Sequence, residues 1–443
     1  MIRSKITVSV VSSAMLRGQN YSFQRVNQQV RSSHTASSAH VQLPLTGIKV
    51  IDLTRVLAGP YATQILADLG AEVIKVEHVT RGDDTRSWGP PFAKDNGKPG
   101  AHGESAYFLS VNRNKKSLAL NFQDKRGQEV LKALIASSDI VIENYLPGSL
   151  AKYGLSYEQL KNDKIIYASI TGYGQNGPFR DRAGYDVMVE AEMGLMHITG
   201  EADGSPVKVG VAVTDLTTGL YAANSIMAAI IGRSKTGMGQ YIDISLADCQ
   251  VATLSNIASS CLISGKPDTG RHGTSHPSIC PYQAFPTKDG SIMIGGANDR
   301  LFGILCRLLG KEEWIIDERF STNALRVKHR DELVPMIMAQ TNLATTEEWL
   351  DIFEGSGIAY AAVNDIQATL NHPQVLARNM VTTIDHPTCG PLKMINTPIK
   401  YSRAKPSIRT APPTLGQHTD EILEGLGLRT KEIDTMRVEG VVG

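Results

Sequence analysis

The sequence predicts an α/β protein with a large, Rossmann-like domain built on a parallel sheet, a smaller α+β domain, and a last segment that returns to the large domain. First, β-branched runs alternate with helical patterns from residue 47 to residue 262. Second, a dense loop signal at 264–273 is followed by two strands with a tight turn and then three helices. Third, helical runs thin out beyond residue 364, where two Pro-rich stretches appear. The length of 443 residues suits two or three domains.

Each expected element follows from a local pattern. Strands are expected where short β-branched runs end in turn residues, at 47–53, 71–77, 117–122, 140–143, 165–170 and 241–246. Helices are expected at 60–69, 125–137, 187–196 and 247–262, the first of them with a proline at its start, where a missing N–H costs nothing. In the smaller domain, two strands fall within 281–294 and turn at 288–290, and helices follow at 300–309, 331–340 and 346–353.

These patterns place the large domain at 41–263, the small domain at 264–363 and the returning segment at 364–443. Residues 1–40 differ from the rest because they contain no Asp or Glu, and the first acid of the chain is Asp52. Arginines dispersed among Ser, Gln and Val are typical of a mitochondrial transit peptide, which predicts a location in the mitochondrial matrix. A disordered tail is the alternative.

Composition excludes several classes of protein. The net charge is +1 and 20% of the residues are charged, so no overall field favours nucleic acid or a membrane surface. No apolar run approaches the roughly 20 residues that span a bilayer. The five cysteines are scattered without a C-x-x-C pair, which argues against a disulfide framework or a zinc site. We therefore expect no bound metal.

Asp215 is the candidate nucleophile. It stands in the run VGVAVTDLTTG (209–219), which predicts a buried strand followed by a helix over 216–231. A carboxylate in the first turn of a helix lies near unpaired N–H groups, which should keep it ionised and fixed in place. These are the properties that a carboxylate nucleophile needs. The alternative is an aspartate that only caps its helix.

The common nucleotide and hydrolase motifs are missing. The first strand-to-helix turn, at 54–60, lacks the G-x-G-x-x-G that binds a dinucleotide, although Glu77 ends the second strand where a ribose-binding acid would lie. The chain also has no P-loop, no H-E-x-x-H and no G-x-S-x-G.

Seven segments stand in the order found in the class III coenzyme A transferases. They are LTRVLAGP (53–60), LGAEVIKVE (69–77), GDDTR (82–86), NRNKKS (112–117), VIENY (141–145), GYGQNGP (172–178) and KTGMGQ (235–240). The resemblance runs from residue 47 to the C-terminus. It implies a CoA-transferase that moves CoA from succinyl-CoA to a dicarboxylic acid such as glutarate. It also implies an interlocked homodimer, and a CoA thioester used as substrate with no permanently bound cofactor.

The resemblance also implies roles for particular residues. Asp215 would attack the thioester carbonyl, form mixed anhydrides and carry CoA as an aspartyl-CoA thioester. The positions that match the family's CoA-binding segments are Leu57, Ala58, Asn144, Tyr145, Leu146 and Lys152, with Gly184, Tyr185 and Asp186 beside the pantetheine end. Arg81, Arg86, Arg113, Lys115 and Lys116 are added on charge alone, because CoA carries a diphosphate and a 3′-phosphate. Leu57 and His78 depart from the family pattern, since relatives have a polar residue and a cation there.

The loop 269–275 matches a glycine-rich loop that closes over the nucleophile in relatives. We expect Arg271, His272 and His276 to offer charge to the far carboxylate of the acid, and Gly273 to give the loop its freedom. A surface loop with incidental cations is the alternative. Trp88 is a candidate to pack against the substrate, with a core or interface position as the alternative.

Two other functions fit the same fold. An α-methylacyl-CoA racemase shares the aspartate but needs a histidine as a second base, and the matching position is Tyr185, a poor base at neutral pH. A non-catalytic acyl-CoA-binding protein is the second alternative. Only a transferase would make glutaryl-CoA from succinyl-CoA while consuming glutarate.

Overall fold

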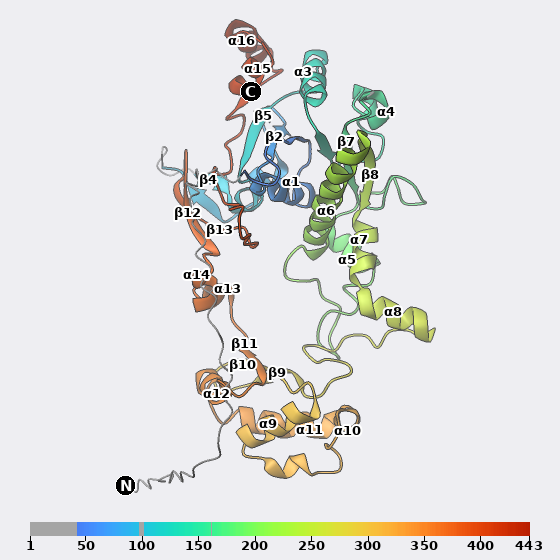
Figure 1. Ribbon diagram of the computed structural model, residues 1–443, viewed down its shortest axis with the longest axis vertical. Helices are drawn as coiled ribbons and strands as arrows, with labels where there is room; N and C mark the ends of the chain where they lie inside the picture. Colours follow the sequence, from blue (N-terminus) through green and yellow to red (C-terminus); the bar gives the residue numbers. More distant parts are fainter. Residues whose placement is uncertain (1–41, 97–101, 161) are drawn as a thin grey trace, which may run out of the picture. The chain divides into compact units, whose positions relative to one another are not determined.

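The computed structural model describes residues 42–96, 102–160 and 162–443, and its central feature is a six-stranded parallel sheet (Figure 1). The strand order is β5-β2-β1-β6-β7-β8, and all neighbours are parallel. The strands are β1 (Lys49–Asp52), β2 (Glu72–Glu77), β5 (Lys115–Ala119), β6 (Ile140–Glu143), β7 (Ile166–Thr171) and β8 (Gln240–Ser245). Strands β2 and β5 lie on one side of β1, and β6, β7 and β8 lie on the other, so the strand order reverses between β1 and β6. Ligands of open α/β sheets bind at the carboxyl ends of the strands beside such a reversal.

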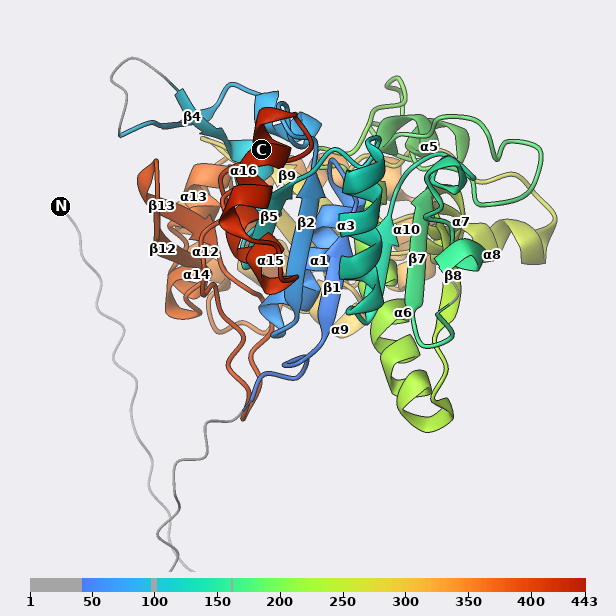
Figure 2. The same cartoon turned by 90° about the horizontal axis from the view of Figure 1, so that it is seen from above.

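Helices cover both faces of this sheet, as its nearly continuous apolar strands require. Val50 and Ile142 pack in one cluster with α1 and α6. Ile51 and Val141 point the opposite way and pack with α3, α15 and α16, which lie on one side of the sheet in Figure 2. These helices are α1 (Ala58–Asp68), α3 (Lys125–Ala136), α6 (Val213–Thr236), α15 (Thr419–Gly425) and α16 (Thr430–Val438). The predicted return of the C-terminal segment to the large sheet is confirmed.

A second cluster of strands and helices forms the smaller α+β region. The antiparallel sheet has the order β11-β10-β9, and its core includes Phe285, Phe302 and Phe353. Its elements are β9 (Tyr282–Pro286), β10 (Ser291–Gly295), α9 (Asp299–Leu308), α10 (Asn323–Lys328), α11 (Arg330–Thr341), α12 (Thr346–Phe353) and β11 (Ala359–Ala362). The fold class predicted from the sequence is confirmed, whereas the domain boundaries stay predictions.

Shorter elements complete the described part of the chain. Two antiparallel pairs are β3 (Phe92–Lys94) with β4 (His102–Ser105) and β12 (Val381–His386) with β13 (Gly390–Ile395). The remaining α-helices are α2 (Ala106–Ser110), α4 (Tyr157–Leu160), α5 (Asp186–Glu192), α7 (Leu246–Thr253), α8 (Ser255–Ser264), α13 (Ile366–Leu370) and α14 (Pro373–Ala377).

The predicted strand before Asp215 is wrong. Residues 209–212 belong to no strand, and α6 begins at Val213, so Asp215 lies inside its first turn. Val211 is 59% exposed, and the N–H of Val209 donates to the buried carboxylate of Glu190 at 3.1 Å. In a strand, the N–H of Val209 would donate to a backbone carbonyl of a neighbouring strand, whereas here it donates to a side chain.

Two predicted helices also differ. The helix expected at 247–262 is two helices, α7 and α8, because Ser255, the first residue of α8, adopts a positive φ of 46°. The helix expected at 187–196 ends at Glu192. The transit-peptide prediction falls on residues 1–40, which lie outside the described residues. Within the described residues, no helix is both long and apolar enough to cross a membrane.

Candidate active site

Asp215 faces a pocket of about 660 Å³ at the carboxyl ends of the parallel strands. Its walls come from the segments that follow β1, β6, β7 and β8, represented by Ala58, Asn144, Gly172 and Leu246. The pocket therefore lies at the reversal of strand order between β1 and β6, where the topology predicts a ligand.

Gly219 brings Asp215 to this pocket. It lies one helical turn after Asp215 on α6, where α6 crosses α1. A Cβ atom at Gly219 would lie 2.7 Å from the carbonyl oxygen of Ala58 and 3.0 Å from the Tyr61 ring. Only a residue without a side chain allows this approach, which sets the first turn of α6 beside the residues that follow β1.

The pKa of Asp215 is raised to about 7, first by burial and second by the carboxylate of Asp186. The backbone N–H of Asp215 donates to Asp186 Oδ1 at 3.0 Å, so the two side chains are held close together. The expectation that the helix dipole keeps Asp215 fully ionised is corrected: desolvation and a like charge outweigh it. Asp215 also raises the pKa of Tyr107 to about 12, after burial as the main cause.

The segment after β1 is tied to the segment after β6. The N–H of Arg55 donates to Asn144 Oδ1 at 3.0 Å, and Asn144 Nδ2 donates to the Arg55 carbonyl at 2.8 Å. The Arg55 guanidinium pairs with Asp84 and lies 5.8 Å from the centre of the Tyr145 ring. Both strand ends therefore present one connected wall to the pocket.

A second pocket, of about 290 Å³, adjoins the first and shares Arg55, Tyr145 and Ser149 with it. Its lining includes the cations Arg81 and Lys152, together with His78. The two pockets form a path from a cationic end to Asp215. Such a path suits an elongated ligand with phosphates at one end.

Most of the site residues predicted from the sequence meet here. The pocket of Asp215 is lined by Leu57, Ala58, Trp88, Asn144, Tyr145, Leu146, Gly184 and Tyr185. Arg81 and Lys152 line the adjoining pocket, and Asp186 contacts Asp215 directly. The predicted CoA segments are thus brought together, although their contact with CoA stays a prediction.

Four cations chosen on charge alone are corrected, because ion pairs elsewhere occupy them. Arg86 is bound to Glu77 and Glu104, and Arg113 to Asp68, all with side chains at most 16% exposed. Lys115 is fully buried against Asp52, Asn112 and the Pro60 carbonyl. Lys116 joins Glu72 of β2 to Glu421 of α15. These side chains stabilise the sheet and its neighbours and do not line either pocket.

The loop expected to close over the nucleophile is bound to residues 197–200 in the described structure. Arg271 Nη1 donates to the His197 carbonyl at 2.9 Å, and the N–H of Gly273 donates to the Gly200 carbonyl at 2.9 Å. His272 pairs with Thr269, and His276 accepts from the N–H of Ser278. Neither of the two pockets is lined by any of the four predicted residues of this loop.

Sequence reasoning missed three arginines that line the pocket of Asp215: Arg55, Arg180 and Arg182. Arg55 falls within the segment 53–60, at the carboxyl end of a predicted strand, which was the available signal. Arg180 and Arg182 follow the segment 172–178. Arg182 lies 5.2 Å from the centre of the Tyr173 ring and pairs with Glu192 at 2.9 Å.

Comparisons with known proteins agree with this geometry. The model of CoA-transferase family III matches residues 45–419. The chain is 49% identical over 403 residues to succinyl-CoA:glutarate CoA-transferase of Mus musculus, covering 90% of each chain. It is 42% identical over 385 residues to succinate–glutarate CoA-transferase of Agrobacterium fabrum, covering 86% of this chain and 96% of the relative. A crystal structure of a CAIB/BAIF family protein from Brucella suis superposes with a TM-score of 0.79 at 42% identity, covering 87% of this chain and 100% of that one.

Proposed function

The chain belongs to CoA-transferase family III, and from this membership and the geometry around Asp215 we propose that it moves CoA from succinyl-CoA to a dicarboxylic acid such as glutarate. The observation that carries the proposal is a half-buried aspartate at the end of a pocket built from the family's CoA-binding segments. As a member of this family the chain is a CoA-transferase; the two acids are proposed from the names of its relatives.

In this proposal CoA lies along the two adjoining pockets. Its phosphates meet Arg81 and Lys152, and pantetheine passes the wall formed by Asn144 and Tyr145 toward Asp215. In this orientation the thioester, which is the end of CoA farthest from the 3′-phosphate, lies beside Asp215.

The proposed reaction begins when the Asp215 carboxylate attacks the thioester carbonyl of succinyl-CoA. The C–S bond breaks, CoA leaves as a thiolate, and a succinyl–aspartyl anhydride forms. The thiolate then attacks the aspartyl carbonyl, which releases succinate and leaves an aspartyl-CoA thioester. Glutarate attacks this thioester, giving a glutaryl–aspartyl anhydride and CoA thiolate. Attack of the thiolate on the glutaryl carbonyl gives glutaryl-CoA and restores the Asp215 carboxylate.

The pKa of about 7 at Asp215 suits its role as the nucleophile of this cycle. A carboxylate whose charge is poorly solvated is a stronger nucleophile than one held by many hydrogen bonds. The raised pKa reflects that poor solvation, and half of the molecules still carry the charge near neutral pH.

We assign the far carboxylate of the dicarboxylic acid to the arginines that line the pocket, Arg180 and Arg182, in place of the loop around Arg271. Each ends in a planar guanidinium that matches a carboxylate with two hydrogen bonds.

We also propose a homodimer and a mitochondrial matrix location. The dimer is supported by α8, where Leu262 and Ile263 are 85% and 87% exposed, and the location by the acid-free residues 1–40.

The test is incubation of the purified full chain with succinyl-CoA and glutarate, followed by mass spectrometry of CoA esters and free acids. The proposal predicts glutaryl-CoA and succinate in equal amounts. A series of dicarboxylic acids of increasing length, with butyrate as the monocarboxylate control, then defines the acceptor. Free CoA without glutaryl-CoA would show a thioesterase, and unchanged succinyl-CoA would contradict the proposal.

A further inference from the structure

Val56 has a backbone conformation that its side chain disfavours. Its φ is 71°, in the left-handed region, where a β-branched residue is a genuine outlier. Val56 stands between β1 and α1, and residues 55–58 all line the pocket of Asp215. Such a conformation persists only where the surroundings enforce it, and it is found most often at functional sites.

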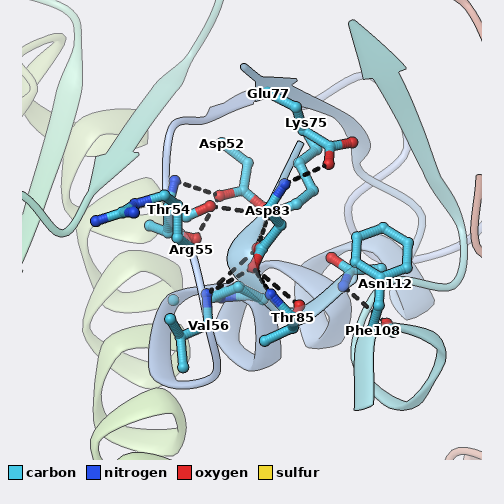
Figure 3. A network of polar contacts seen from close by, with 12 residues as sticks. Asp52, Thr54, Arg55, Val56, Lys75, Glu77, Asp83, Thr85, Phe108 and Asn112 are labelled. Atoms are coloured by element: carbon cyan, nitrogen blue, oxygen red, sulfur yellow. Dashed lines mark hydrogen bonds and ion pairs between the residues drawn. The ribbon is translucent and has the colours of Figure 1, made fainter. Parts of the chain in front are cut away.

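The Asp83 carboxylate holds Val56 in this conformation (Figure 3). Both of its oxygens accept the Val56 N–H, each at 3.2 Å. One of them also accepts the N–H of Thr85 at 3.0 Å and its hydroxyl at 2.8 Å, which caps the short 3₁₀ turn Asp84–Ser87. That turn supplies Asp84 and Ser87 to the same pocket. One carboxylate therefore fixes two walls of the pocket.

Lys75 fixes the carboxylate in turn. Its ammonium lies 2.8 Å from Asp83 Oδ2, and both side chains are completely buried. The same ammonium donates to the Thr54 carbonyl at 2.8 Å, two residues before Val56. Burial alone would raise the pKa of Asp83, but Lys75 and the hydrogen-bond donors outweigh it and lower the pKa to about 2. The acceptor is therefore an anion at every working pH.

We propose that Asp83 is a positioning residue, which keeps Val56 in the left-handed conformation and so presents residues 55–58 to the acyl-CoA. The inference rests on the proposed function, because the ligand is a CoA thioester. Asp83 borders the pocket that adjoins that of Asp215, but its carboxylate is completely buried and lies outside the pocket of the reacting atoms; it acts through the backbone of Val56. Its loss therefore weakens binding of the thioester more than it slows the chemistry at Asp215.

The first test compares Asp83→Asn with Asp68→Asn. An amide has a single acceptor oxygen, which cannot satisfy Val56, Thr85 and Lys75 together. We expect KM for succinyl-CoA to rise about 10-fold with kcat changed less than about 2-fold. Asp68→Asn breaks a similarly buried ion pair, with Arg113, that lies outside both pockets, so it should lower stability without raising KM. Asp83→Glu, which keeps the charge for Lys75 but displaces the oxygens, should also raise KM.

The second test is rescue at the strained residue itself. Glycine adopts a positive φ without strain, so the Val56→Gly background needs no carboxylate to hold the turn. We expect Asp83→Asn to raise KM less than about 3-fold in that background, a coupling that a general structural role would not produce. An equal rise in both backgrounds, or an equal rise for Asp68→Asn, would overturn the inference. Absence of succinyl-CoA binding by the unmodified protein would instead defeat the proposed function.

Discussion

Replacing Asp186 by Asn tests how the site sets the ionisation of Asp215. The amide keeps an oxygen that accepts the Asp215 N–H, a bond of 3.0 Å, and removes only the charge. The pKa of Asp215 lies at about 7 against an ordinary value of 3.8, with burial as the larger cause and Asp186 as the smaller. Asp186 therefore accounts for less than half of the rise. We expect the substitution to lower the pKa by about one pH unit, which corresponds to about 1.4 kcal/mol.

The assay is kcat/KM for succinyl-CoA from about pH 5 to pH 9, because this ratio reports the pKa values of the free enzyme. Activity should rise with pH as Asp215 loses its proton, with a midpoint near pH 7 in the unmodified protein and about one unit lower in Asp186→Asn. Asp203→Asn removes a charge from an exposed residue outside both pockets and should leave the midpoint in place. A midpoint that does not move in Asp186→Asn, or that moves equally in Asp203→Asn, would refute the reasoning.

Three further predictions concern stability, packing and targeting. Because the folded-state pKa of Asp215 lies above its unfolded value, its ionisation costs stability as pH rises from about 4 to 7. Asp215→Asn should therefore raise the free energy of unfolding by about 1–2 kcal/mol at pH 8, seen as a higher melting temperature, but not at pH 4. An equal change at both pH values would contradict this. Gly219→Ala should lower kcat by about 10- to 100-fold, because the added Cβ displaces Asp215 from its partners. Gly232→Ala, on the same helix but with open space around the new Cβ, should leave kcat unchanged. An equal loss of kcat in both variants would refute the packing explanation. Removal of residues 1–40 should leave kcat unchanged, and the same segment fused to a reporter should carry it into mitochondria; a cytosolic reporter would contradict that location.

The parallel sheet could be predicted because its strands are buried on both faces and carry continuous apolar runs. Val50 and Ile51 face opposite clusters, yet both are completely buried, so the strand pattern is strong. The run before Asp215 carries a similar pattern without a neighbouring strand to pair with. Its N–H at Val209 is satisfied by Glu190, a tertiary contact that local sequence does not reveal.

The candidate site, too, could be predicted from the sequence only in part. Leu57, Asn144 and Asp215 could be assigned because they stand in segments that match a family. The sequence does not distinguish Arg113 and Lys115 from cations that bind a ligand, because their ion-pair partners, Asp68 and Asp52, lie 45 and 63 residues away in the chain. The raised pKa of Asp215 likewise depends on its burial and on Asp186 of a different helix.

The central claim is that Asp215 carries CoA as a covalent thioester. The most direct measurement is peptide mass spectrometry after incubation with succinyl-CoA alone and trapping with hydroxylamine, which converts an acyl-aspartate to its hydroxamate. The account predicts a hydroxamate on Asp215, formed only when succinyl-CoA is present and lost when glutarate is added before the trap. Modification of a different carboxylate, such as Asp186 or Glu143, or an unmodified Asp215 in a protein that still makes glutaryl-CoA, would contradict it.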